Sequence, residues 1–156
     1  MISNATPLIC LAKIGQLDLL KKLFALVTVP LAVKEEVLLQ GKPEFIVLAE
    51  FFKNDWITIA SPLKDVDLSL GKGETAAILL ARERKDVLLI DDAYAIKTAH
   101  AFSLEIHRTT TIMFLAVQKK IITKNEAIYF IDKIIENGYY IAPQYYAMIL
   151  KKLSTS

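Results

Sequence analysis

The stretch Val87-Leu88-Leu89-Ile90-Asp91-Asp92 indicates the fold of this chain. Four consecutive apolar residues are typical of a central parallel strand that is buried on both faces. The two aspartates mark the point at which the strand gives way to helical sequence. A strand of this kind predicts a parallel sheet that carries helices on both sides, joined by right-handed crossovers.

Outward from this stretch, short apolar runs alternate with segments of helical periodicity along the whole chain. The other expected strands are the opening segment before Asn4 and residues 26–30, 56–59 and 103–107. The first expected helix opens immediately beyond Asn4, with Pro7 in its first turn. The other expected helices cover residues 17–24, 31–38, 45–52, 74–84, 93–101, 111–120, 124–137 and 144–153. This alternation predicts an α/β fold, a three-layer α/β/α sandwich with a central parallel sheet, in a single domain over residues 1–156.

Composition narrows the class of protein. Hydrophobic residues make up 54% of the chain and the mean hydropathy is +0.39, yet charged residues interrupt every apolar stretch before it reaches membrane-spanning length. We therefore expect no membrane segment, and an apolar surface that is covered by a second copy or a partner.

The single cysteine, Cys10, excludes an intrachain disulfide, and the absence of a leader-like N-terminus favours a cytoplasmic location. A net charge of +2 leaves room only for a local nucleic-acid-binding patch.

Acidic or carboxamide residues stand where apolar runs give way to helices. They are Asn4, Glu74, Asp91 and Asp92. Because parallel strands bring their carboxyl ends to one edge of the sheet, these side chains are expected to meet in one cleft. Gathered carboxylates repel one another unless a cation lies between them. The pattern therefore predicts a site for Mg²⁺ or Mn²⁺, which prefer oxygen ligands and assist phosphoryl chemistry.

Each of these residues also has a structural alternative. Asn4 and Asp92 could cap the helices that follow them, and Glu74 could be stabilised by a helix dipole in a first turn. Asp91 is harder to explain structurally, because adjacent carboxylates at the end of a buried strand disfavour each other's ionisation. Glu36 lies on a helix beside core residues and is expected to be solvated, with a supporting role behind the metal ligands as the less favoured alternative.

Several motifs recur in the order and spacing of a known family. They are Ser3-Asn4-Ala5-Thr6-Pro7-Leu8-Ile9, Leu11-Ala12-Lys13-Ile14-Gly15, Val29-Pro30, Ala32-Val33-Lys34-Glu35-Glu36, Gly73-Glu74-Thr75-Ala76-Ala77-Ile78 and Leu89-Ile90-Asp91-Asp92. Together they resemble a PIN-domain protein of the small prokaryotic branch, from the N-terminus to about residue 120. Asn4 stands where the family has its first aspartate.

The resemblance implies a nuclease-like centre in which carboxylates bind divalent ions and activate a water. Single-stranded RNA is the usual substrate of the family, many members are toxins held by a cognate antitoxin, and homodimers are common. The implied metal ligands are Asn4, Glu74 and Asp92, with Asp91 as neighbour or alternate. The residues expected to contact RNA are Lys97, Arg108, Thr109 and Thr110.

Two function classes follow. The first is a Mg²⁺- or Mn²⁺-dependent ribonuclease that uses Glu74, Asp91, Asp92 and Asn4. The second is a module without catalytic activity that binds RNA or a partner protein through basic residues such as Lys97 and Arg108. A phosphate-accepting receiver domain is disfavoured, because its late-strand lysine has no counterpart here.

Overall fold

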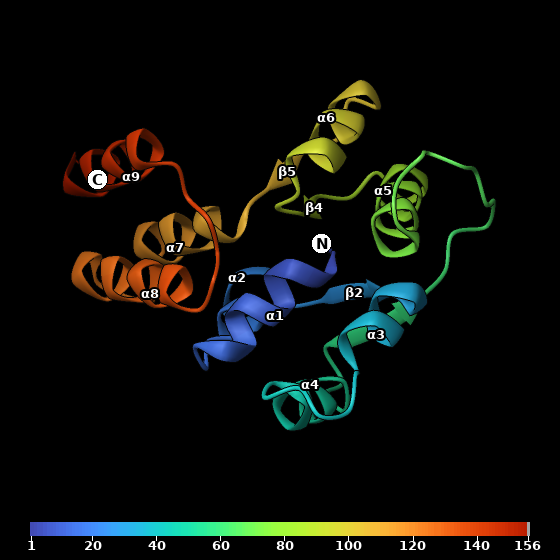
Figure 1. Ribbon diagram of the computed structural model, residues 1–156, viewed down its shortest axis with the longest axis horizontal. Coiled ribbons are helices and arrows are strands. Elements are labelled where there is room, and N and C mark those ends of the chain that lie inside the picture. Colours follow the sequence, from blue (N-terminus) through green and yellow to red (C-terminus); the bar gives the residue numbers. More distant parts are fainter. Residues whose placement is uncertain (156) are drawn as a thin grey trace.

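The computed structural model describes residues 1–155 and contains a five-stranded sheet in which every pairing is parallel. The strands run in the order β3-β2-β1-β4-β5 (Figure 1). Their bounds are β1 Ile2–Ser3, β2 Val27–Pro30, β3 Ile57–Ala60, β4 Leu88–Leu89 and β5 Ile106–His107.

Within residues 1–155, nine helices accompany the sheet. Their bounds are α1 Ala5–Lys13, α2 Asp18–Phe24, α3 Leu31–Val37, α4 Phe45–Phe51, α5 Lys72–Arg84, α6 Ala93–Ala101, α7 Thr109–Gln118, α8 Lys124–Glu136 and α9 Pro143–Thr155. No helix in this part of the chain is long and apolar enough to cross a membrane.

The apolar run at β4 separates two hydrophobic clusters. Leu88 and Ile90 pack with residues of α5 and α6, whereas Leu89 packs with Val27, Val29 and residues of the other helices. Leu88, Leu89 and Ile90 are all 0% exposed. Full burial of one such side chain contributes about 1.5–3 kcal/mol, so both faces of the strand favour the buried position. Figure 1 shows the same division, with α5 and α6 on one side of the strands and α1, α7 and α8 on the other. The prediction of a three-layer α/β/α sandwich is confirmed.

The chain changes direction across the sheet between β1 and β4. From β1 it proceeds outward to β2 and β3, and from β4 it proceeds the opposite way to β5. β1 and β4 are hydrogen-bonded neighbours, with Ser3 opposite Leu89, and the Asn4 backbone N–H donates to the Leu89 carbonyl over 2.9 Å. Ligands of open α/β sheets bind outside the carboxyl ends of the strands at such a switch point. Asn4 and Asp91 both follow strands that flank it.

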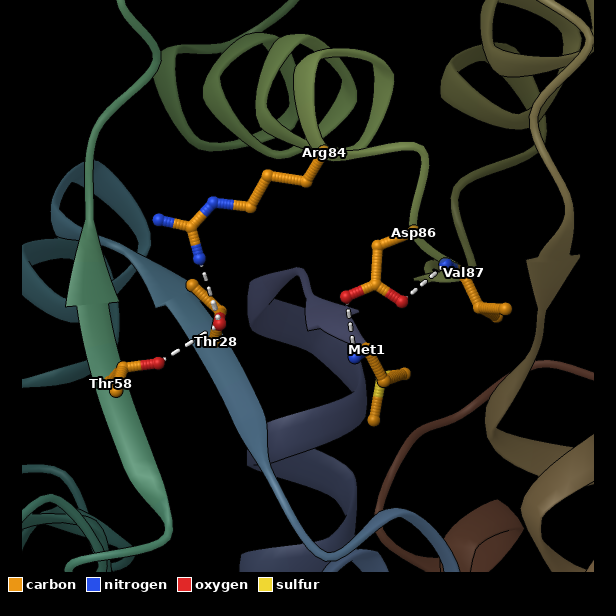
Figure 2. Close-up of polar contacts among 6 residues, drawn as sticks. All are labelled: Met1, Thr28, Thr58, Arg84, Asp86 and Val87. Carbon is orange, nitrogen blue, oxygen red and sulfur yellow. Dashed lines mark hydrogen bonds and ion pairs between the residues drawn. The ribbon is translucent and has the colours of Figure 1, made fainter.

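Polar contacts link the amino ends of the strands, which lie on the side of the sheet away from Asn4 and Asp91 (Figure 2). The N-terminal ammonium of Met1 lies 2.7 Å from Asp86 Oδ2, just before β4. Arg84, at the end of α5, donates to the Thr28 hydroxyl on β2, and Thr28 and Thr58 share a hydrogen bond of 2.9 Å between β2 and β3. These contacts hold the segment that connects α5 to β4, and they therefore help to set where the carboxyl end of β4 lies.

Several element boundaries differ from the sequence-based prediction. α7 begins at Thr109 rather than residue 111, because the Thr111 hydroxyl accepts from the Arg108 backbone N–H and closes the first turn earlier. The strand expected over residues 103–107 is reduced to β5. Ser103, which follows α6, instead adopts a left-handed conformation with φ of 56°, and the Leu104 N–H donates to the Ala99 carbonyl. This is a common way to end a helix. By contrast, the first helix begins at Ala5, immediately beyond Asn4 as predicted.

Candidate functional site

Gly73, in the first turn of α5, is the point at which three elements meet. A Cβ atom at this position would overlap the carboxylate of Glu36 from α3 and lie 3.6 Å from Asn4 Oδ1, at the end of β1. It would also lie 3.3 Å from Val33 Cγ2. The absence of a side chain at Gly73 therefore lets Glu36 and Asn4 approach the same small volume.

Asn4 is buried, with 2% of its surface exposed, and its Oδ1 has no hydrogen-bond partner within residues 1–155. It occupies the N-cap position of α1, but its side chain makes no capping hydrogen bond. The structural alternative of a capping side chain is therefore not realised. A buried acceptor without a partner costs about 1–3 kcal/mol, and a cation is one partner that would satisfy it.

The Glu36 carboxylate approaches the same volume as this amide, and the Glu74 carboxylate lies near Glu36. Burial raises the pKa of Glu36 above its usual range, and the nearby Glu74 carboxylate raises it further. The Glu74 carboxylate folds back over Gly71, at the N-terminus of α5, where a negative charge is favoured. Two neighbouring carboxylates repel each other unless a cation lies close to both.

Glu36 is the candidate site residue that the sequence analysis gave only as a less favoured alternative, since solvation was the expected role. Its position on the surface of α3 gave no signal of its own. The informative feature was Gly73, a glycine inside a helix, where a close approach by another element is a common reason for the missing side chain.

The adjacent aspartates after β4 make different contacts. Asp92 caps α6, because its Oδ1 accepts the Ala95 N–H over 2.8 Å. One of its two carboxylate oxygens therefore has the capping role that the sequence analysis gave as an alternative to metal binding. Asp91 Oδ1 accepts the Thr109 N–H over 2.9 Å, and its Oδ2 accepts the Thr109 hydroxyl over 2.6 Å. The two carboxylates thus hold different helices, α6 and α7.

Tyr139, between α8 and α9, adds a third hydrogen bond to Asp91. Its hydroxyl donates to Asp91 Oδ1 over 2.5 Å. Burial raises the pKa of Tyr139, and the negative charge of Asp91 raises it further, so the phenol remains a neutral donor. Asp91 therefore joins the end of β4, the start of α7 and the segment before α9.

The four residues expected to contact RNA occupy different environments. Thr109 is 0% exposed and is bound to Asp91, and Thr110 is also buried. Arg108 stands at the N-cap position of α7, with its guanidinium carbon 5.9 Å from the ring centroid of Tyr145. Lys97 is exposed on α6. Arg108 and Lys97 are the two with accessible charge.

The oxygens of Asn4, Glu36 and Glu74 form a donor set that suits Mg²⁺ or Mn²⁺, since hard cations prefer carboxylate and amide oxygens. Of the predicted ligands, Asn4 lies beside Gly73 together with Glu36, and Glu74 lies close enough to Glu36 to raise its pKa. Asp91 and Asp92 instead contact α7 and α6. No group of three or more His, Cys, Asp or Glu side chains within residues 1–155 is arranged to hold a metal. The candidate centre therefore consists of two carboxylates and an amide.

Neither a search of curated proteins nor a search of solved structures returned a match. A family model, DUF3368, which is described as a PIN domain, matches residues 1–155. PIN domains have a nuclease-like fold and generally depend on divalent metal ions. The chain belongs to the PIN-domain family.

Proposed function

We propose that this protein is a divalent-metal-dependent ribonuclease of the PIN toxin type that acts on single-stranded RNA. The observation that carries the proposal is the convergence over Gly73 of an unpartnered buried amide oxygen, from Asn4, with the Glu36 carboxylate, beside Glu74. Oxygen donors that lack a protein partner, at the switch point of a parallel sheet, are suited to bind a hard cation.

In the proposed centre, Asn4, Glu36 and Glu74 hold the metal. Asp92 lies outside this set of three donors and is proposed as a further ligand through the carboxylate oxygen that does not cap α6. Asp91 is proposed to orient the end of β4 through Thr109 and Tyr139. When bound, the metal would lower the pKa of a water and stabilise charge on the scissile phosphate. Arg108, Lys97 and Thr110 are the residues proposed to contact the RNA backbone, and the two cations among them match its charge.

The metal site is tested by soaking crystals in Mn²⁺ and collecting data for an anomalous map. We expect a peak within coordination distance of Glu74 and Asn4, because the like charges of Glu36 and Glu74 favour a cation between them. Crystals of Glu74→Gln protein, which keeps the shape of the side chain and removes its charge, should lose the peak. A wild-type map with no peak near Asn4, Glu36, Glu74 or Asp92 would contradict the proposal.

A second candidate function is an RNA- or partner-binding module without catalysis. Two observations favour it. Asn4 offers a neutral oxygen where the resemblance implies an aspartate, and both oxygens of Asp91 already accept hydrogen bonds from the protein. A neutral ligand weakens the attraction of a site for a divalent cation.

We also propose that the protein forms a homodimer or a complex with an antitoxin-like partner. Large apolar side chains are exposed on and around α3 and α4, and such surfaces are often interaction sites. They are Leu31 at 44%, Leu39 at 51%, Ile46 at 74% and Val47 at 44% exposure. Light scattering is expected to give the mass of a dimer or a complex. A monomer over a wide concentration range, with no protein co-purifying from the native host, would contradict this.

A further inference from the structure

Two cavities open side by side at the carboxyl end of β4. One has a volume of about 390 Å³ and extends past Cys10 and Lys13 of α1. The other, of about 290 Å³, extends toward Tyr145 of α9. Asp91, Arg108, Tyr139 and Tyr140 line both of them. We name the region walled by the shared residues Arg108, Tyr139 and Tyr140, together with Tyr145 of the second cavity, the tyrosine groove.

The tyrosines of this groove are used in two different ways. Tyr139 is partly buried and its hydroxyl is bound to Asp91, so it forms part of the wall. Its neighbour Tyr140 is 82% exposed, and Tyr145 is 48% exposed. An aromatic ring held at a cavity mouth presents a flat apolar face to solvent, which is the platform on which nucleobases stack.

Cationic groups lie beside the aromatic rings. The Arg108 guanidinium lies over the Tyr145 ring, and Lys13 lines the wider cavity. The negative charge of Asp91 at the base of the groove is engaged by three hydrogen bonds, from the Thr109 backbone, the Thr109 hydroxyl and Tyr139. Neutral bases and anionic phosphates therefore both find a complementary partner here.

We propose that the tyrosine groove holds one unpaired nucleobase of a single-stranded RNA, stacked on Tyr140 or Tyr145, with an adjacent phosphate on Arg108. A volume of about 290 Å³ lies just below the roughly 300–1,000 Å³ typical of ligand cavities, and suits a single base rather than a base pair. A base within a duplex has both faces covered by its neighbours and cannot stack on a side chain. The inference rests on the proposed function, since it specifies how the substrate of that centre is held.

The test is the fluorescence anisotropy of a labelled single-stranded oligoribonucleotide, measured in EDTA so that binding is observed without cleavage. At least one of Tyr140→Ala and Tyr145→Ala is expected to weaken binding about tenfold, as the loss of one stacked base predicts. Tyr140→Phe, which keeps the ring, should bind like the wild type. Tyr129→Ala removes a 57%-exposed tyrosine of α8 that lines neither cavity, and should have no effect.

Three results would contradict the proposal that the tyrosine groove binds a nucleobase. They are equal affinity in Tyr140→Ala, Tyr145→Ala and the wild type; equal affinity for a duplex of the same sequence; and no binding of single-stranded RNA at all. Cleavage assays with Mg²⁺ or Mn²⁺ separate this outcome from that of the proposed function. Tyrosine-dependent binding without cleavage keeps the groove and rejects the nuclease. Cleavage with an unchanged KM in both alanine variants keeps the nuclease and rejects the groove.

Discussion

Asn4→Asp is expected to bind Mn²⁺ at least about tenfold more tightly than the wild type, which corresponds to about 1.4 kcal/mol. The substitution replaces a neutral amide oxygen by a charged one in the buried volume that Glu36 also approaches. A full charge attracts a divalent cation more strongly than a dipole does, and the partly dry surroundings screen this attraction less than water would. Isothermal titration calorimetry measures the difference directly.

The same substitution, which should strengthen Mn²⁺ binding, should destabilise the metal-free protein. A third carboxylate beside Glu36 and Glu74 adds like-charge repulsion, so in EDTA we expect the free energy of unfolding to fall by about 1–3 kcal/mol. Mn²⁺ should reverse this loss. The matched control is Asn4→Asp in a Glu74→Gln background, where both effects should shrink. Unchanged Mn²⁺ affinity and unchanged stability in EDTA would show that residue 4 does not face a cation site.

Asp91→Ala is expected to lower the free energy of unfolding by about 2–4 kcal/mol, measured by urea denaturation. Truncation leaves the fully buried Thr109 hydroxyl and the Tyr139 hydroxyl without their acceptor. It also releases the segment before α9 from the end of β4. Asp91→Asn, which keeps one carbonyl oxygen, should lose less.

Asp92→Ala provides the comparison for Asp91→Ala. This variant removes a single capping bond to Ala95, and we expect a loss of about 1 kcal/mol. If the main role of a carboxylate is to bind metal, its replacement by alanine should leave the free energy of unfolding of the metal-free protein unchanged or raise it. Asp91→Ala protein as stable as the wild type in EDTA would therefore contradict the linking role of Asp91.

The layers of the fold could be predicted because burial acts on every residue of a central strand. The apolar run at β4 is buried on both faces, and this requirement is visible in the sequence. β5 was predicted longer than it is, since Ser103 leaves α6 in a left-handed conformation that its residue type does not announce. α7 begins two residues earlier than predicted because the Thr111 side chain closes its first turn.

The site was only partly predictable, for a different reason. Residues that follow strands, such as Asn4 and Asp91, can be placed at one edge of the sheet from topology alone. Glu36 reaches the site from a helix, and Tyr139 contacts Asp91 across a sequence separation of 48 residues. Neither contact follows from periodicity, because each depends on how helices pack across the sheet.

The proposed function is tested most directly by the cleavage of single-stranded RNA by Asn4→Asp protein in Mg²⁺ or Mn²⁺. We predict that cleavage rises above that of the wild type and is lost in EDTA. It should also be lost when Glu74→Gln or Asp92→Asn is added to the Asn4→Asp background, whereas a contaminating ribonuclease would be indifferent to these changes. Cleavage that stays at background in Asn4→Asp protein across several single-stranded RNAs, or that persists unchanged with Glu74→Gln, would contradict a metal-dependent nuclease centre.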